Sequence, residues 1–164
     1  MKKALWSGVA AVAAVLVVST SAFAQASANA SIAVTANVNA KAKLTLGTAS
    51  ITFADADPDT TPTMTATAFN IDVKARASGA VTLTVLASGD LTATGGTIPI
   101  SSLTWTATGS GFQNGTSDKT TAQTVGSWAA SGSPSGTQTF SLPNSWTYAT
   151  GTYTVTLNYT LTAP

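Results

Sequence analysis

The sequence predicts an all-β protein that folds as a single antiparallel β-sandwich of about eight to ten strands. Threonine alternates with apolar residues along most of the chain from residue 31 onward. Turn-forming clusters such as Ser88-Gly89-Asp90 and Asn114-Gly115 separate the alternating runs. No segment after residue 24 combines a helical period with a capping residue. A period of two with frequent turns is typical of short strands.

The clearest strand lies close to the C-terminus. Its apolar face consists of Tyr153, Val155, Leu157, Tyr159 and Leu161, and threonine and asparagine occupy the positions between them. The same alternation predicts strands at 71–76, 81–85 and 103–108, and weaker runs predict strands at 44–46, 50–53, 63–69, 124–128 and 137–142. The sandwich domain is therefore expected to cover residues 44–164, with a surface loop at 109–121.

The first 24 residues have the features of a secretory signal peptide. Lys2 and Lys3 precede an apolar stretch at 4–18, and Ala22-Phe23-Ala24 forms a small-x-small cleavage site. The alternative is a membrane anchor, but the apolar stretch is shorter than the roughly 20 residues that cross a bilayer. We expect cleavage before Gln25 and a secreted mature chain with no membrane span.

The composition excludes most enzymes. The chain has no cysteine, no histidine and no glutamate, and only 8% of its residues are charged. Acid–base and nucleophilic catalysis draw mainly on these missing residue types. We therefore predict no catalytic residues and no required cofactor. The mature chain has five basic and six acidic residues, so its net charge of −1 gives no electrostatic attraction to nucleic acid.

An alternating arm precedes the sandwich domain, within residues 25–43. Ile32, Val34, Ala36 and Val38 alternate with polar or small residues, a pattern that predicts an extended strand. Two interpretations are open. The arm is either the first strand of its own sheet or a strand donated to the sheet edge of a neighbouring subunit. Donation is a head-to-tail contact, and such contacts can grow into a filament.

The chain resembles the secreted pilin-like subunits of chaperone–usher fimbriae, especially the spore coat U type. The resemblance rests on the signal peptide, the alternating arm, the all-β body and the terminal G-x-Y-x-x-x-L pattern that begins at Gly151. It implies a pilin-like or immunoglobulin-like sandwich on the bacterial cell surface. It also implies that residues 32–38 are the donor strand and that the strand from Tyr153 to Leu161 lines the acceptor groove. The implied partners are further copies of the chain, a periplasmic chaperone and an outer-membrane usher.

A second resemblance is local. Residues 151–161, with the closing Ala163-Pro164, are similar to the tail of WxL domains, which attach to the cell walls of Gram-positive bacteria. Those domains have tryptophan where this chain has Tyr159. This resemblance implies wall attachment.

Three aspartates at alternate positions are candidate calcium ligands. Asp55, Asp57 and Asp59 form the only concentration of charge in the sequence. Calcium prefers several oxygen ligands from one loop. The alternative is a solvated turn, because aspartate also favours turns.

Aromatic residues suggest a sugar-binding platform. Trp128, Trp146 and Tyr148 are its candidate members, whereas Trp105 lies in an alternating strand and is expected in the core. The main prediction remains a secreted, non-enzymatic structural subunit that assembles into a filament, pilus or coat by strand donation. The alternative is a carbohydrate-binding or wall-binding module.

Overall fold

The computed structural model describes residues 28–164, so the predicted signal peptide lies outside the described residues. The chain divides into two units, residues 1–36 and 37–164, and the second unit contains every strand found among the described residues. Its elements are β1 (Lys41–Leu46), β2 (Thr63–Thr65), β3 (Phe69–Arg76), β4 (Val81–Ala87), β5 (Leu91–Ala93), β6 (Gly96–Ile98), the 3-10 helix η1 (Ile100–Ser102), β7 (Thr104–Thr108), β8 (Gly115–Thr116), β9 (Gln123–Trp128), β10 (Ser135–Pro143) and β11 (Leu157–Thr162). The predicted all-β class is confirmed.

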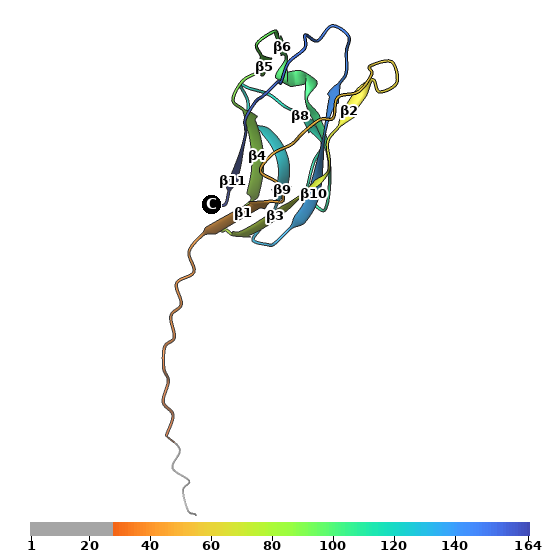
Figure 1. Cartoon of the computed structure of the whole chain (residues 1–164). Coiled ribbons are helices and arrows are strands. Elements are labelled where there is room, and N and C mark those ends of the chain that lie inside the picture. Colours follow the sequence, from red (N-terminus) through yellow and green to blue (C-terminus); the bar gives the residue numbers. More distant parts are fainter. Residues whose placement is uncertain (1–27) are drawn as a thin grey trace, which may run out of the picture. The chain divides into compact units, whose positions relative to one another are not determined.

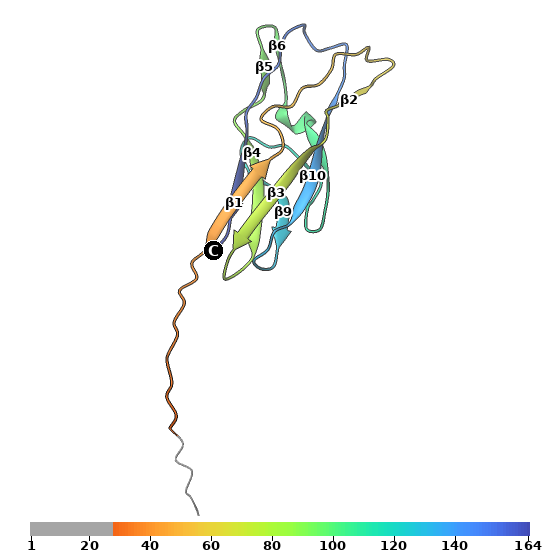
Figure 2. The ribbon, with the colours of Figure 1, turned by 60° about the horizontal axis from the view of Figure 1, so that its bottom comes forward.

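The strands form two main antiparallel sheets. The larger has the order β1-β3-β10-β7-β8, with β2 paired to β10, and the smaller has the order β11-β4-β9. A separate hairpin joins β5 and β6. The smaller sheet lies across one face of the larger one, as Figures 1 and 2 show from two directions. This layering is that of a β-sandwich.

The core lies between the two sheets because each central strand turns its apolar residues inward. Ile71 on β3, Leu83 on β4 and Phe140 on β10 are completely buried. Trp105 on β7 is also buried, with its ring centroid 5.9 Å from that of Phe140. Its expected place in the core is thus confirmed. Full burial of one such side chain stabilises the fold by roughly 1.5–3 kcal/mol.

Three segments predicted as strands differ in the structure. The strand predicted at 63–69 is interrupted at 66–68, between β2 and β3. Residues 50–53 are in no strand, and the predicted strand at 153–161 is a paired strand only from Leu157 onward. In these last two segments the apolar side chains are half-buried, as the alternation predicts. Alternation decides which face of a segment turns inward, but a strand also needs a neighbour to pair with. Residues 50–53 have no such neighbour among the described residues, and 153–156 has only the bridge of Thr154 to Thr92.

The shortest strands were not predicted from the sequence. β5, β6 and β8 have three residues or fewer, too few to show a period. β8 lies within the predicted 109–121 loop, against the ring of Trp105. A Cβ atom at Gly115 would lie 2.3 Å from that ring, so only glycine allows this close approach. The indole nitrogen of Trp105 donates a hydrogen bond to the Gln113 carbonyl at 2.9 Å.

The first strand begins at Lys41, inside the segment predicted as the arm. Lys41 pairs with Arg76 and Lys43 with Lys74, which extends the β1–β3 ladder by three residues beyond the predicted boundary at residue 44. Strand pairing therefore begins three residues before the apolar alternation on which the predicted boundary was based.

Among residues 28–164, no helix is long and apolar enough to cross a membrane.

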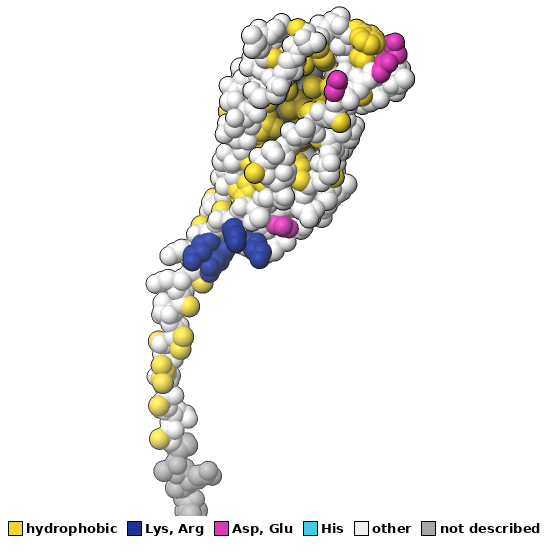
Figure 3. Space-filling view, viewed as in Figure 1, with side chains coloured by type: hydrophobic (Ala, Val, Ile, Leu, Met, Phe, Trp, Pro, Cys, Tyr) yellow, Lys and Arg dark blue, Asp and Glu magenta, His cyan; other side chains and the backbone are white. Residues whose placement is uncertain are grey.

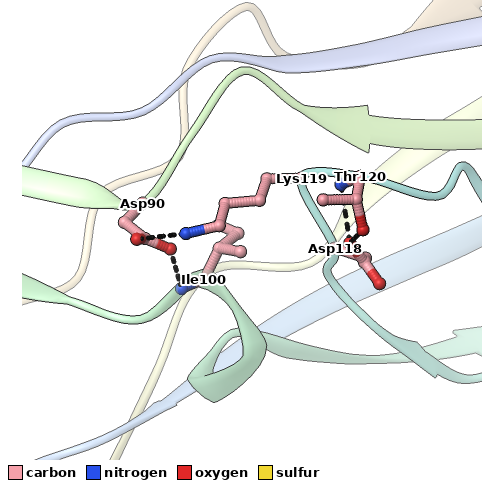
Figure 4. Close-up of polar contacts among 5 residues, drawn as sticks. All are labelled: Asp90, Ile100, Asp118, Lys119 and Thr120. Carbon is pink, nitrogen blue, oxygen red and sulfur yellow. Dashed lines mark hydrogen bonds and ion pairs between the residues drawn. The ribbon is translucent and has the colours of Figure 1, made fainter.

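Asp90 joins the loop after β4 to the loop before β9 by an ion pair and to η1 by a hydrogen bond (Figure 4). The Asp90 carboxylate accepts hydrogen bonds from the Lys119 ammonium at 2.6 Å and from the Ile100 amide at 2.9 Å. These bonds lower the pKa of Asp90. Asp118 accepts hydrogen bonds from the backbone amide and the hydroxyl of Thr120, which lower its pKa as well. These three charged residues therefore have partners within the body itself.

Candidate functional site: an apolar groove between two sheet edges

A groove of about 1130 Å³ lies on the surface of the unit 37–164. Its floor consists of core residues, among them Phe69, Leu103 and Phe140. Figure 3 shows apolar side chains in a hollow of the body. Apolar patches of this kind on a soluble protein usually mark a binding surface.

One flank of the groove is the segment that follows β1. Leu46, Ile51 and Phe53 line the groove and are half-buried against the core. The backbone amides and carbonyls of residues 51–55 form no hydrogen bond with any other described residue. This flank therefore offers apolar side chains and free backbone groups together.

The opposite flank is formed by the approach to β11. Tyr153, Val155 and Leu157 line the groove. Thr154 exchanges two backbone hydrogen bonds with Thr92, and the carbonyl of Thr156 accepts one from Ser88. Successive peptide groups of an extended chain point to opposite sides. The backbone groups of Tyr153 and Val155 therefore point away from this pairing, toward the unpaired side.

Both flanks continue into sheet edges. β1 is an edge strand of the larger sheet, and β11 is an edge strand of the smaller one. Unpaired edges are ready templates for another strand. From Tyr153 to Tyr159 an extended chain covers about 20 Å. An extended segment from Ile32 to Val38 has the same length of about 20 Å, so this flank of the groove matches the predicted donor strand in length.

A polar pair lies beneath one end of the groove. The Tyr159 hydroxyl donates a hydrogen bond of 2.6 Å to Oε1 of Gln138, which is completely buried on β10. Burial raises the pKa of Tyr159 above its ordinary value, although the hydrogen bond to Gln138 opposes this effect. Nε2 of Gln138 has no partner among the described residues. The pair ties β11 to the facing sheet. Gln138 was not predicted from the sequence, although a glutamine at an inward position of the 137–142 alternation was a visible signal.

The predicted acceptor strand and donor strand have different surroundings. Tyr153, Val155, Leu157, Tyr159 and Leu161 all pack partly against the core, and all except Leu161 line the groove. Residues 28–40 are in no strand. In this arm the side chains of Ile32 and Val34 are 90% and 89% exposed, and Val38 is 65% exposed. Ala36 is exposed as well.

The three candidate calcium ligands are exposed and lie on one loop. Oδ1 of Asp57 accepts a hydrogen bond from the Asp59 amide, and Oδ1 of Asp59 accepts one from the Trp146 indole nitrogen at 3.1 Å. Asp55 has no hydrogen-bond partner among the described residues. Within residues 28–164, no three acidic, histidine or cysteine side chains are grouped so that they could share a metal ion. Calcium binding stays a prediction.

The candidate aromatic platform is divided between two parts of the body. Trp128 on β9 packs edge-on against Phe112, with centroids 5.1 Å apart, and its indole donates to the Ser110 carbonyl. Trp146 and Tyr148 lie on the segment after β10. Tyr148 is half-buried against the core, whereas Trp146 is 69% exposed. Only Trp146 presents most of its surface to solvent.

The groove therefore combines an apolar floor, two unpaired backbone edges and the length of one strand. Such a site has the features of a receptor for an extended chain. Comparison of the chain with protein-family models, with curated proteins and with solved structures found no match.

Proposed function

We propose that this protein is an extracellular structural subunit that assembles into a filament, pilus or surface coat. In this proposal the arm of one copy enters the groove of the next. The observation that carries the proposal is the presence, in one chain, of an apolar groove with an unpaired flank and of an exposed arm with matching alternation.

The energetics favour insertion of the arm. Ile32, Val34 and Val38 are largely exposed, and burial of each large aliphatic side chain contributes roughly 1.5–3 kcal/mol. The inserted strand would also pair with the free backbone groups of the flanks, as in other cases of β-augmentation. Because donor and acceptor surfaces differ, the contact is head-to-tail and can repeat without closing.

An open groove also calls for control before assembly. Exposed sheet edges and apolar surface promote uncontrolled pairing between chains. A periplasmic chaperone that covers the groove, and an outer-membrane usher that releases it to the next subunit, would provide that control. Both partners are consistent with the proposed location on a bacterial cell surface.

The direct test is a pair of neighbouring arm substitutions in the mature chain from Gln25. Val34→Asp places a charge on the apolar face of the arm, and Thr35→Asp places the same charge on the opposite face. We expect filaments or larger assemblies for the wild-type and Thr35→Asp chains, and monomers for Val34→Asp. Light scattering after size-exclusion chromatography and negative-stain electron microscopy would provide the readout. Equal behaviour of the two variants would contradict arm donation.

A second candidate function rests on Trp146. Its indole is 69% exposed and is held by Asp59, an arrangement that suits stacking against a sugar ring. A carbohydrate-binding or wall-binding module would lose affinity for oligosaccharide or peptidoglycan when Trp146→Ala is introduced. Val34→Asp would leave that affinity unchanged.

A further inference from the structure

Four basic residues gather at the end of the body where β1 begins. Lys41 pairs with Arg76 and Lys43 with Lys74 across the β1–β3 ladder, and all four side chains are exposed. We call these four residues the basic patch. Asp72, the partner of Thr45 in the same ladder, is the one acidic residue beside it. Figure 3 shows the basic side chains together at this end of the body.

Three acidic residues lie at the other end of the same sheet. Asp55, Asp57 and Asp59 are exposed, and we call them the acidic tip. Asn144 holds their loop, because its Nδ2 donates to the carbonyls of Ala56 and Thr61 at 2.9 and 3.1 Å. Along β10, Ser135 pairs with Asp72 and Pro143 pairs with Thr63. These two levels are about 27 Å apart, by the rise per residue of a strand.

Neither group has an ion-pair partner within the described chain. The only salt bridge among residues 28–164 joins Lys119 to Asp90. The basic patch and the acidic tip are therefore two unpaired charged surfaces of opposite sign. A body with separated charges of this kind attracts a second copy end to end.

The groove connects the two charged surfaces to arm insertion. Asp55 and Asp57 line the groove from the loop before β2, which pairs with the Pro143 end of β10. Leu46 also lines the groove, and its ladder partner Ile71 lies opposite Gly136, seven residues earlier on β10 and nearer to the basic patch. The arm of any copy continues directly into Lys41 and Lys43. From Val38 to Lys41 is a distance of about 10 Å in an extended chain. Whichever end of the groove receives Val38 will therefore also receive the basic patch of the donor.

The two possible directions of insertion differ in electrostatic energy. If Val38 lies at the end with Asp55 and Asp57, the donor's basic patch meets the acidic tip. If Val38 lies at the other end, the donor's basic patch approaches the acceptor's own basic patch, and like charges repel. The charge distribution favours the first direction.

Resting on the proposed function, we infer that the basic patch of one copy docks on the acidic tip of the copy that receives its arm. This contact would add to arm insertion and fix its direction, so that successive subunits all point the same way. Because the charges are exposed, the contact would weaken at high ionic strength. It would accelerate association more than it would tighten the final complex.

A binding experiment can test this contact without requiring polymerisation. The acceptor is the mature chain with Val34→Asp, whose own arm is disabled. The probe is a labelled peptide of residues 28–43 with blocked termini, compared with the same peptide carrying Lys41→Glu and Lys43→Glu. By fluorescence anisotropy at low ionic strength, we expect the altered peptide to bind about tenfold more weakly. At 1 M salt the difference should disappear.

Matched acceptor variants locate the contact. Asp55→Lys changes the acidic tip, and Asp72→Lys makes the same change beside the basic patch. Both aspartates are exposed, and neither forms a hydrogen bond through its side chain among the described residues. We expect Asp55→Lys to weaken binding of the natural peptide and to strengthen binding of the Glu peptide, whereas Asp72→Lys should have little effect.

The outcomes separate this inference from the function on which it rests. If neither peptide binds at any salt concentration, the proposed arm donation fails. If both peptides bind with the same affinity, arm donation stands and the charged contact is overturned. A larger effect of Asp72→Lys than of Asp55→Lys would overturn the direction we infer.

Discussion

β4 and the segment 153–161 have the same alternation of apolar residues with threonine, yet their surroundings differ. β4 lies between β11 and β9, and its inward residues Val81, Leu83, Val85 and Ala87 are buried. In segment 153–161 the inward residues are only half-buried, and one side of its backbone is unpaired. The difference shows that the pattern sets the inward face, whereas burial depends on a neighbouring strand. On the groove side of the sandwich, that neighbour is absent from the described chain.

The largest expected effect on unfolding free energy comes from comparing a substitution in the central strand β4 with one at the unpaired flank of the groove. Leu83→Ala removes a completely buried side chain and should lower the free energy of unfolding by about 2–5 kcal/mol. Leu157→Ala, at the half-buried groove flank, should cost clearly less in an isolated subunit. Urea denaturation of both variants in the Val34→Asp background measures the contrast. Equal costs would mean that the groove is already filled.

A strand bound in the groove should pair with segment 153–161 and bury its apolar residues, as the neighbours of β4 do for that strand. A peptide of residues 28–40, added to the Val34→Asp chain at 100 times its dissociation constant, should raise the unfolding free energy by about 2.7 kcal/mol. The same peptide with Val34→Asp should have no effect. Thermal unfolding with each peptide provides the comparison, and stabilisation by both peptides would argue against recognition of the apolar face.

The polar pair at Tyr159 should produce a smaller effect that depends on pH. Tyr159→Phe leaves Oε1 of Gln138 buried without its donor, which should cost about 1–3 kcal/mol. The raised pKa of Tyr159 means that the folded state favours the neutral phenol. Its stabilisation is therefore complete below pH 10 and is lost as the pH rises above 10, where tyrosine ionises in the unfolded chain.

A double variant provides the control for this pair. Tyr159→Phe combined with Gln138→Leu removes both partners and should be closer to wild type in stability than Tyr159→Phe alone. Denaturant titrations at pH 7 and above pH 10 would separate the hydrogen bond from the ionisation. A wild-type chain whose stability falls no faster above pH 10 than that of Tyr159→Phe would contradict a buried neutral Tyr159.

The sequence predicted the faces of the strands better than their partners. Ile71, Val73 and Leu83 fall on the apolar faces predicted for their strands and are buried, because a period of two is visible in the chain itself. The missing neighbour of residues 50–53 could not be predicted in this way, because pairing depends on segments distant in sequence. The same limit applies to the short strands β5, β6 and β8.

The site was predicted in part. The inward residues of 153–161 were named from their alternation, and four of these five line the groove. Ile51 and Phe53 on the opposite flank were read as a strand, and Gln138 was not singled out. The acidic residues Asp55, Asp57 and Asp59 were named from the sequence, but the basic patch was not. Lys41 and Arg76 are 35 positions apart, and only the β1–β3 ladder brings them together.

The most direct test of strand donation is a crosslink between the arm of one copy and the groove of another. The chain contains no cysteine, so introduced cysteines are the only thiols. Chains carrying Val155→Cys would be mixed separately with chains carrying Ala36→Cys, Val34→Cys or Thr35→Cys, then oxidised and separated on non-reducing gels. We predict a mixed disulfide dimer with Ala36→Cys or Val34→Cys and little with Thr35→Cys, whose side chain lies on the opposite face. Equal crosslinking of all three arms, or of none, would contradict donation of the arm to the groove.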